Sequence, residues 1–475
     1  MRARADMPSG HGELVLQPPD LDEWAELAVR NSALAETWEF EVGNVPARTL
    51  RAHARAVLSE TARDATDRLG LPVAGPSAGP VIVTGHQPEI YHAGVWVKDF
   101  ALQHVATCLG GTGIDLVVDS DVFEEVGLTA PCLGRGERLT RCRHLLVLNT
   151  SGACFACTPV PSPGDIDDFC TSTVAALATL HAPAIGTHFH RFCDALRMSA
   201  EHSTNLAELI TGARRRFEGD LTDYLELPVT ELSLTEPFRR FATDILLDAK
   251  RFADAYNSEL AEYRALSNLR SSAQPFPDLK VTQDAIEIPF WVLGPEGRAP
   301  AFVVPTDNSI ELRWARERLV LPQDTDGALA VLGEAEAMVV PRAVTLTLFA
   351  RAFLADLFIH GIGGDRYDRV TEGVARRWWG IDLPPFAVAS LTMYLPLGAA
   401  PVNEEDIAQI EQRLHRLVHN PDESLGEVVF ESAEERRAAR MLVEEKRALV
   451  DAISRPGADR STLGLRIKGL NRELA

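Results

Sequence analysis

An apolar stripe with helical spacing predicts that the first part of the chain is helical. Four apolar residues at positions i, i+3, i+6 and i+7 share one face of a helix. They are Leu21, Trp24, Leu27 and Ala28. We therefore expect helices over residues 20–70, ended by the proline- and glycine-rich stretch 72–80.

Short β-branched runs separated by a helical stretch come next. Residues 80–85 and 114–118 are predicted as buried parallel strands, with a helix over residues 93–109 between them. A third strand is expected at residues 145–149. This order of elements predicts a βαβ unit, and hence an α/β fold built on a mostly parallel sheet.

The middle of the chain is mainly helical in pattern, and we expect residues 165–275 to be a helical insertion. Strand character returns at residues 286–293 and 300–305, which flank a Gly-Pro-Glu-Gly turn and predict a β-hairpin. A short strand at residues 337–341 is followed by an apolar helix predicted over residues 343–359. The glycines that follow His360 would cap that helix.

The last part of the chain changes to a helical pattern with apolar residues at a and d spacing. These residues are Ile407, Ile410, Leu414 and Leu417. A helical hairpin against the core and a coiled coil that forms a homodimer are equally consistent with this pattern.

These patterns divide the chain into five expected segments. They are an N-terminal helical segment (1–75), the first part of the core (76–164), a helical insertion (165–275), the second part of the core with the hairpin and a glycine-rich loop (276–400), and a C-terminal helical or coiled-coil segment (401–475).

The charge balance argues against nucleic acid as a partner. The 475 residues include 47 Lys and Arg against 68 Asp and Glu, a formal net charge of −21, which repels a phosphate backbone. The N-terminal residues lack the apolar region of a secretory signal, and four prolines interrupt the uncharged stretch 383–402. We expect a cytoplasmic protein with small-molecule partners and no membrane contact.

Seven cysteines lie between Cys108 and Cys193. An odd number in a chain without a secretory signal predicts reduced thiols rather than a disulfide framework. Cys154 and Cys157 form a CxxC motif, but no second CxxC supplies the remaining ligands of a zinc site. We predict buried thiols and no metal site, with zinc binding and a redox pair as alternatives.

The segment from Thr84 to Lys98 carries the most chemistry. It joins a predicted strand to a predicted helix, where open α/β sheets place ligands. Its amides and glycines suit an anionic ligand, and either imidazole could act as a general base near neutral pH. The alternative is an ordinary loop whose polar side chains bond the backbone. The candidate residues are Gly85, His86, Gln87, His92, Gly94 and Lys98.

Polar residues also follow two other predicted strands. Asp119 and Asp121 could bind a ribose hydroxyl, an ammonium group or Mg²⁺, although a solvated turn has the same pattern. Arg342 could clamp a carboxylate or a phosphate.

A glycine-rich turn begins at His360, which is the third candidate catalytic residue. Such a turn exposes backbone amides to anions, although its glycines could equally serve only to cap helices. The candidate binding residues in this turn are Gly363, Gly364, Asp365 and Tyr367. Complete GxGxxG, Walker A, GxSxG and HExxH motifs are absent from the chain, which removes most common enzyme classes.

Residues 81–98 resemble the TGQQxGLFxGP strand-turn-helix of the bacillithiol-synthesis cysteine-adding enzymes. Thr84, Gly85 and Gln87 match that motif, whereas His86 replaces its first Gln. The order of later segments over residues 80–450 is also similar. These segments are Pro289–Trp291, Pro341–Arg342 and Gly363–Tyr367, the last in the place of a GGPxExxY loop.

The resemblance implies a Rossmann-like core of the class I nucleotidyl-transferase type, and His92-Ala93-Gly94 is similar to the first half of that class's HxGH signature. It also implies a carbon–nitrogen ligase or aminoacyl-transfer enzyme that joins an amino acid, cysteine in that family, to a sugar-derived amine, glucosamine-malate. The cofactor stays open, with ATP or ADP and Mg²⁺ as candidates. A ligand carboxylate and amine would meet among His86, Gln87, His92, Asp119, His360 and Tyr367.

A second resemblance rests on the same segment. His86-Gln87-Pro88 and Gly94–Lys98 are similar to the HQPxYxPWxGYxxK opening of WbqC-like proteins from bacterial glycan loci, with one residue fewer between the halves. It implies a glycan-modifying transferase. That opening lies near the N-terminus of the family, so the residues that precede it here favour the first resemblance.

Two functions of other classes also remain open. One is a non-catalytic protein that binds a small molecule in the same pocket. The other is a scaffold that acts through its C-terminal helices.

Overall fold

The computed structural model describes residues 8–134, 138–180, 182–266, 277–294, 297–397, 404–427, 433–455 and 458–474. The chain divides into two units, Met1–Leu397 and Gly398–Ala475, each with its own helices.

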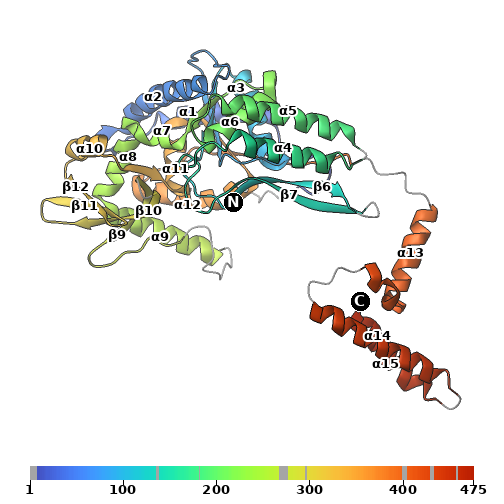
Figure 1. Cartoon of the computed structure of the whole chain (residues 1–475). Coiled ribbons are helices and arrows are strands. Elements are labelled where there is room, and N and C mark those ends of the chain that lie inside the picture. The colour runs from blue at the N-terminus through green and yellow to red at the C-terminus, as the bar shows by residue number, and fades with distance from the viewer. Residues whose placement is uncertain are drawn as a thin grey trace. The chain divides into compact units, whose positions relative to one another are not determined.

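The central sheet of the first unit has the strand order β1-β15-β14-β4-β5-β8. Figure 1 shows this unit with its chain coloured by residue number. All neighbouring pairs are parallel except β1 with β15. The strands are β1 (Glu13–Gln17), β4 (Val81–His86), β5 (Thr112–Val117), β8 (Leu225–Pro228), β14 (Leu357–His360) and β15 (Ala387–Thr392). The predicted α/β fold with a mostly parallel sheet is therefore confirmed.

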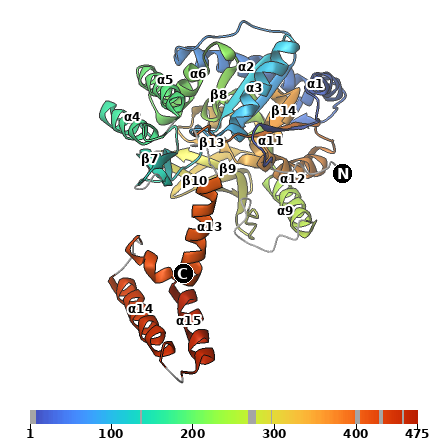
Figure 2. The same ribbon diagram turned by 90° about the vertical axis from the view of Figure 1, so that its right-hand side faces the viewer.

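Helices cover both faces of this sheet, which explains why its strands are apolar on both sides. Ile82 of β4 packs with Trp24 of α1 (Leu21–Ala35) and Leu102 of α3 (Ala93–Cys108) on one face. Both helices are labelled in Figure 2. On the opposite face, Val81 and Val83 join the largest hydrophobic core. The helices of this core are α2 (Ala47–Arg68), α7 (Val229–Leu234), α8 (Glu236–Leu247), α9 (Ala249–Leu266), α10 (Thr325–Glu334), α11 (Ala343–Phe349) and α12 (Ile362–Trp379).

An antiparallel sheet with the order β12-β11-β10-β9-β13 packs into the same core. Its strands are β9 (Ile286–Gly294), β10 (Gly297–Pro305), β11 (Ser309–Trp314), β12 (Glu317–Pro322) and β13 (Met338–Pro341). The predicted hairpin and the predicted strand near residue 340 are both present. Gly294 pairs with Gly297 at the end of the hairpin.

The remaining elements of the first unit lie outside its two main sheets and the helices already named. They are β2 (Glu41–Val42), β3 (Val45–Pro46), the hairpin β6 (Glu125–Leu133) and β7 (Leu139–Leu148), α4 (Pro163–Leu177), α5 (Pro183–Ala200), α6 (Leu206–Glu218), the 3₁₀ turn Gly219–Leu221 and the π-helical turn Ala350–Leu354. The hairpin and α4–α6 enclose a second core that contains Phe155, Phe169 and Leu196.

Two element predictions were wrong because a short apolar run does not distinguish a buried strand from a helix, and one strand that was predicted correctly belongs to a different sheet. Residues 357–359, expected at the end of a helix, belong to β14, and Gly361 is the N-cap of α12 rather than the C-cap of a preceding helix. Residues 225–228, inside the expected helical insertion, form the edge strand β8. The third strand, expected at residues 145–149, is part of β7, which pairs with β6 and not with the central sheet.

Buried polar contacts fix β14 against β4 at the amino ends of both strands and again near their carboxyl ends. Asp356 accepts a hydrogen bond from the Val81 amide at 2.8 Å and pairs with Arg51 at 2.8 Å. Farther along, the Thr84 hydroxyl donates to the Ile359 carbonyl at 2.9 Å. These bonds hold the strand ends, and the side chains that follow them, in a fixed register.

The second unit contains α13 (Glu404–His419), a 3₁₀ turn (Pro421–Glu427), α14 (Ala433–Ile453) and α15 (Arg460–Leu474). Arg466 of α15 pairs with Glu445 of α14 at 2.7 Å, and Asn471 donates to the His419 carbonyl at 2.6 Å. Among the described helices of the whole chain, none is long and apolar enough to cross a membrane.

Candidate functional site

A cavity of about 540 Å³ opens at the carboxyl ends of β4, β5 and β14, and we call it the β4–β14 cavity. Residues from the central sheet, the antiparallel sheet and α12 line it. Among them are Gly85, His86, Gln87, Asp121, Glu287, Trp291, Arg298, Arg342, His360, Gly364 and Asp368. The cavity brings together seven residues singled out from the sequence, which are Gly85, His86, Gln87, Asp121, Arg342, His360 and Gly364.

His86 ends β4 and is a neutral hydrogen-bond acceptor toward the cavity. Its Nδ1 lies 3.0 Å from the Gln87 carbonyl, which can only accept, so Nδ1 carries the proton and Nε2 is left unprotonated. Burial, followed by the nearby Lys98 ammonium, lowers the pKa of His86 to about 4. The imidazole is therefore uncharged at pH 7.

Two arginines lie against Trp291, and each is paired with a carboxylate. The Arg342 guanidinium is 4.0 Å from the centre of the Trp291 ring and donates to Glu287 at 2.9 Å. Arg298 is 4.5 Å from the same ring and donates to Asp121 at 2.6 Å. The cavity thus presents positive and negative groups side by side on one aromatic wall, an arrangement that suits a ligand bearing both charges.

His360 ends β14, opposite His86, and is held by Asp368 of α12. Its Nε2 lies 3.3 Å from Oδ2 of Asp368, which also pairs with Arg351. Burial opposes ionisation of Asp368, but Arg351 and His360 hold the pKa of its carboxyl below the usual value. A Cβ at Gly364 would lie 2.5 Å from Nδ1 of His360, so this imidazole needs a glycine in the first turn of α12.

Several other predicted residues lie outside this cavity. His92 is exposed and caps α3 by accepting the Gly94 amide at 3.1 Å, and both residues belong to that cap rather than to the site. Lys98 is 4% exposed and donates to the Gly85 carbonyl at 2.9 Å, so it supports the end of β4. Gly363 is exposed on α12.

The predictions for Asp365 and Tyr367 concern side chains outside the described residues. Their backbones belong to the first turns of α12.

Asp119 faces a different cavity, of about 480 Å³, which Cys157 also lines, and we call it the CxxC cavity. Its carboxylate accepts hydrogen bonds from the Thr230 amide at 3.0 Å and from the Thr230 hydroxyl. Burial raises the pKa of Asp119 to about 7, although these hydrogen bonds oppose that rise. The expected meeting of Asp119 with His86 and His360 in one pocket is therefore wrong.

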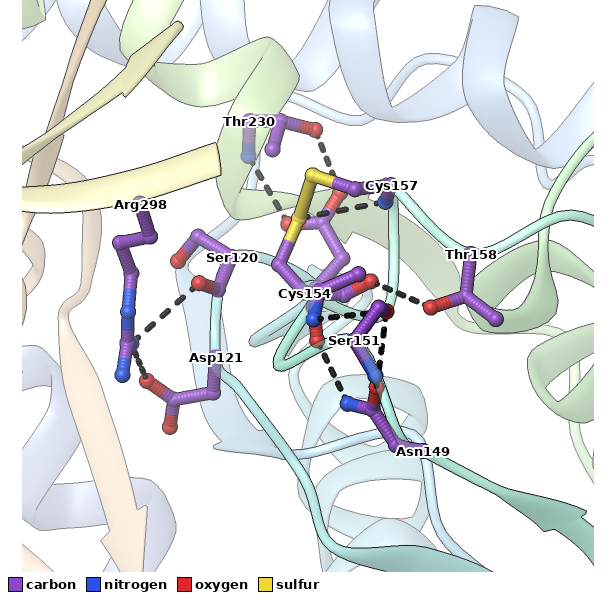
Figure 3. The surroundings of a disulfide bond; sticks show 11 residues. Ser120, Asp121, Asn149, Ser151, Cys154, Cys157, Thr158, Thr230 and Arg298 are labelled. Atoms are coloured by element: carbon purple, nitrogen blue, oxygen red, sulfur yellow. Dashed lines mark hydrogen bonds and ion pairs between the residues drawn. A yellow bond between two sulfur atoms is a disulfide. The ribbon is translucent and has the colours of Figure 1, made fainter. Parts of the chain in front are cut away.

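The prediction of reduced thiols is also wrong for four of the cysteines. Disulfides join Cys132 to Cys142, across the β6–β7 hairpin, and Cys154 to Cys157 (Figure 3). The sequence does not reveal the first pairing, because it depends on the hairpin that brings the two strands together. In the second pairing, the turn after Cys154 brings Cys157 next to Cys154.

The two aspartates expected to bind Mg²⁺ do not fit that ion. Asp121 is engaged by Arg298 and by the Gln87 side-chain amide at 3.0 Å, and Asp119 lies in the other cavity. Over the described part of the chain, no group of three or more His, Cys, Asp or Glu side chains is arranged to hold a metal ion.

Sequence reasoning missed Arg298, Glu287 and Asp368 as members of the β4–β14 cavity. Trp291, noted only for its place in a hairpin, is the surface on which both arginines stack. The available signal was Glu287 and Trp291 on β9 with Arg298 on the paired strand β10. The segments that these residues face could be identified only from the fold.

No protein-family model matches the chain, and a search of curated proteins finds no match to it.

Proposed function

We propose that the protein is a cytosolic carbon–nitrogen ligase or aminoacyl-transfer enzyme whose substrates meet in the β4–β14 cavity. Across the sheet, the parallel strands lie in the order β8-β5-β4-β14-β15. Numbered by their order along the chain, this arrangement is 3-2-1-4-5. This order supports a Rossmann-like core, whose ligands bind where the strand order reverses. That point lies between β4 and β14, and the two strands end in His86 and His360.

The observation that carries the proposal is the paired charge on Trp291. An amino acid has a carboxylate and an ammonium group, and the cavity offers Arg298 and Arg342 for the first and Asp121 and Glu287 for the second. Guanidinium groups bind carboxylates in a bidentate manner, and buried sites of this kind fix a ligand's orientation. An amino-acid substrate, cysteine by resemblance, therefore fits the wall better than a ligand with one charge.

His86 is the candidate acceptor for the proton that the attacking amine loses when its nitrogen bonds to the acyl carbon. Its Nε2 is unprotonated, but a pKa of about 4 is low for a general base at neutral pH. A bound carboxylate or phosphate would raise that pKa, because negative charge favours the imidazolium form. If no bound ligand raises the pKa of His86, the geometry favours the second candidate function, which is a protein that binds an amino acid without catalysis.

Thermal unfolding in the presence of ATP, ADP, cysteine, other amino acids and glucosamine-malate, singly and in pairs, tests the proposal. A ligand at a hundredfold excess over its Kd stabilises the folded state by about 2.7 kcal/mol. We expect a shift with an amino acid that is lost in the Arg298→Ala, Arg342→Ala double variant. The matched control is His92→Asn, which keeps the cap of α3 and should keep the shift.

Mass spectrometry of mixtures that produce a shift separates the two candidate functions. A joined product supports the enzyme, and binding without product supports the non-catalytic protein. Absence of any shift, or a shift that survives loss of both arginines, would contradict an amino-acid site in this cavity.

We also propose that α13 forms a homodimer. Its a and d residues Ile407, Ile410 and Leu414 are exposed, Ile410 to 57%. Burying such a stripe against a second copy is the usual solution for a heptad pattern. Light scattering should show a dimer that Ile410→Asp weakens and Gln412→Asp, on the opposite side of α13, leaves intact; a monomeric wild-type chain would contradict this proposal.

A further inference from the structure

The turn that carries Cys154 and Cys157 is fixed to the end of β5 by contacts that do not involve sulfur. The Phe155 amide donates to the Asp121 carbonyl at 3.1 Å, and the Ala156 amide donates to the Asp119 carbonyl at 2.9 Å. The Phe155 ring is buried and stacks on Phe123, with ring centres 4.4 Å apart. The two sulfurs are therefore held close together whether or not they are bonded.

The two sulfurs have different surroundings. Cys154 is completely buried beside Leu293 and Val340, whereas Cys157 is exposed and lines the CxxC cavity. The amide of Cys157 donates a hydrogen bond to Sγ of Cys154 at 3.1 Å (Figure 3). An incoming thiolate can therefore reach only Cys157, and the amide stabilises negative charge on Cys154.

From this arrangement we propose that Cys154–Cys157 is a thiol–disulfide exchange site for small thiols. The thiolate of the small thiol attacks Sγ of Cys157, forming a new S–S bond while the Cys154–Cys157 bond breaks. The electron pair of the broken bond remains on Cys154, whose thiolate accepts the Cys157 amide. A leaving thiol that is stabilised in this way departs faster.

A second molecule of the small thiol completes the exchange. Its thiolate attacks the sulfur of the first small thiol, releases Cys157 as a thiolate, and leaves a disulfide of two small molecules. The thiols are oxidised and the protein disulfide is reduced, so the step needs no other oxidant. In the reverse direction, the reduced pair would reduce a small disulfide.

The charge of the CxxC cavity identifies the class of thiol. Carboxylates line it, and the one arginine among its described lining residues, Arg68, is already paired with Glu231. The other acidic residues at the cavity surface include Glu208 and Glu336, whereas Asp119 adds charge only in its ionised form, because burial raises its pKa to about 7. An uncharged or positively charged thiol is therefore favoured over an anionic one.

The full chain carrying Cys108→Ser, which removes the exposed free thiol, is the material for the test. The oxidised protein is mixed with 2-aminoethanethiol or with 3-mercaptopropionate, quenched with an alkylating agent, and digested for mass spectrometry. We expect Cys154–Cys157 to be reduced about tenfold faster than Cys132–Cys142, because Cys132 is buried and Cys142 half-buried. With rates corrected for thiol pKa, the amine-bearing probe should react faster.

Two variants test which cysteine the small thiol attacks and which one leaves. In Cys154→Ser, the small thiol's disulfide should leave a stable mixed disulfide on Cys157, and in Cys157→Ser the buried Cys154 should stay unmodified. Equal reduction rates for the two disulfides of the otherwise native chain, or a mixed disulfide confined to Cys154, would overturn the proposal. The rate comparison needs no change at either cysteine, so it stands even if a variant fails to fold.

Discussion

The β4–β14 cavity and the CxxC cavity receive one aspartate each from the same Asp-Ser-Asp segment after β5, yet they use these carboxylates in opposite ways. Asp121 faces the guanidinium of Arg298 at 2.6 Å. Asp119 accepts hydrogen bonds from the amide and hydroxyl of Thr230, and burial raises its pKa to about 7. Asp119 is buried, whereas the Asp121 side chain is 33% exposed and pairs with Arg298, so the burial and the partners that the fold supplies, not the local sequence, set the surroundings of each carboxylate.

The two cavities also differ in their overall charge, and Trp291 connects them. In the β4–β14 cavity Trp291 carries two arginines, and it packs against the buried cluster that contains Cys154. The first cavity suits a ligand with a carboxylate and an amine, and the second suits an uncharged or cationic thiol. A substitution that changes the packing of Trp291 is therefore expected to affect both cavities.

The largest expected effect comes from exchanging the two aspartates for asparagine. The folded-state pKa of Asp119 lies above its unfolded value of 3.8, so the stability of the wild type falls as pH rises from about 4 to about 7. Asp119→Asn removes this pH-dependent loss. The free energy of unfolding of the variant minus that of the wild type should therefore increase by up to about 4 kcal/mol from about pH 4 to about pH 7, at about 1.4 kcal/mol per pH unit. Denaturant unfolding at several pH values measures it.

Asp121→Asn is the matched control for that experiment. It removes the partner of Arg298, so we expect it to destabilise the protein at neutral pH by about 1 kcal/mol. If both variants changed stability in the same direction at pH 8, the contrast between the two cavities would be wrong.

The next effect concerns the glycines of α12. A Cβ at Gly364 would lie 2.5 Å from His360, whereas a Cβ at Gly363 meets no atom within 4 Å. We expect Gly364→Ala to destabilise the protein by about 2 kcal/mol through overpacking. Gly363→Ala should be neutral or stabilise by up to about 1 kcal/mol, because alanine favours a helix. Urea unfolding of the pair decides whether His360 is held as described.

A smaller effect is expected from Thr230, which holds Asp119. Thr230→Val removes the hydroxyl donor, which should raise the pKa of Asp119 further and penalise its charged form. The loss of stability should be about 1 kcal/mol larger at pH 8 than at pH 5. Thr230→Ser keeps the hydroxyl and should show no such pH dependence; if Ser and Val behave alike, the hydrogen bond does not set the pKa.

The smallest effect is a missing titration. The pKa of His86 is lowered from its ordinary value of 6.5 to about 4. The neutral, buried imidazole therefore stabilises the folded protein by a constant amount above pH 6.5, and this stabilisation is lost as the pH falls toward 4. NMR of the histidine ring carbons should show no His86 titration between pH 5.5 and 8 in the absence of ligand. His86→Asn identifies the resonance, and a midpoint near 6.5 would contradict the buried, neutral imidazole.

The sequence located much of the β4–β14 cavity because polar residues that follow parallel strands converge at one edge of a sheet. His86, Gln87, Asp121 and Arg342 were placed in this way, each within three residues of the end of a predicted strand. His360 was chosen for the wrong reason, since its strand was taken for a helix. Arg298 could not be found, because nothing local links β10 to the end of β5.

By itself, the sequence determined the α/β class, the predicted strands at residues 80–85 and 114–118, the hairpin near Trp291 and the acidic charge, because periodicity and turn residues act over a few positions. Only the tertiary structure decided that residues 357–360 are a strand, that Asp119 and Asp121 face different cavities, and that four cysteines pair. Each of these depends on which distant segment a residue meets, and burial against that segment, rather than local propensity, sets its conformation and its charge.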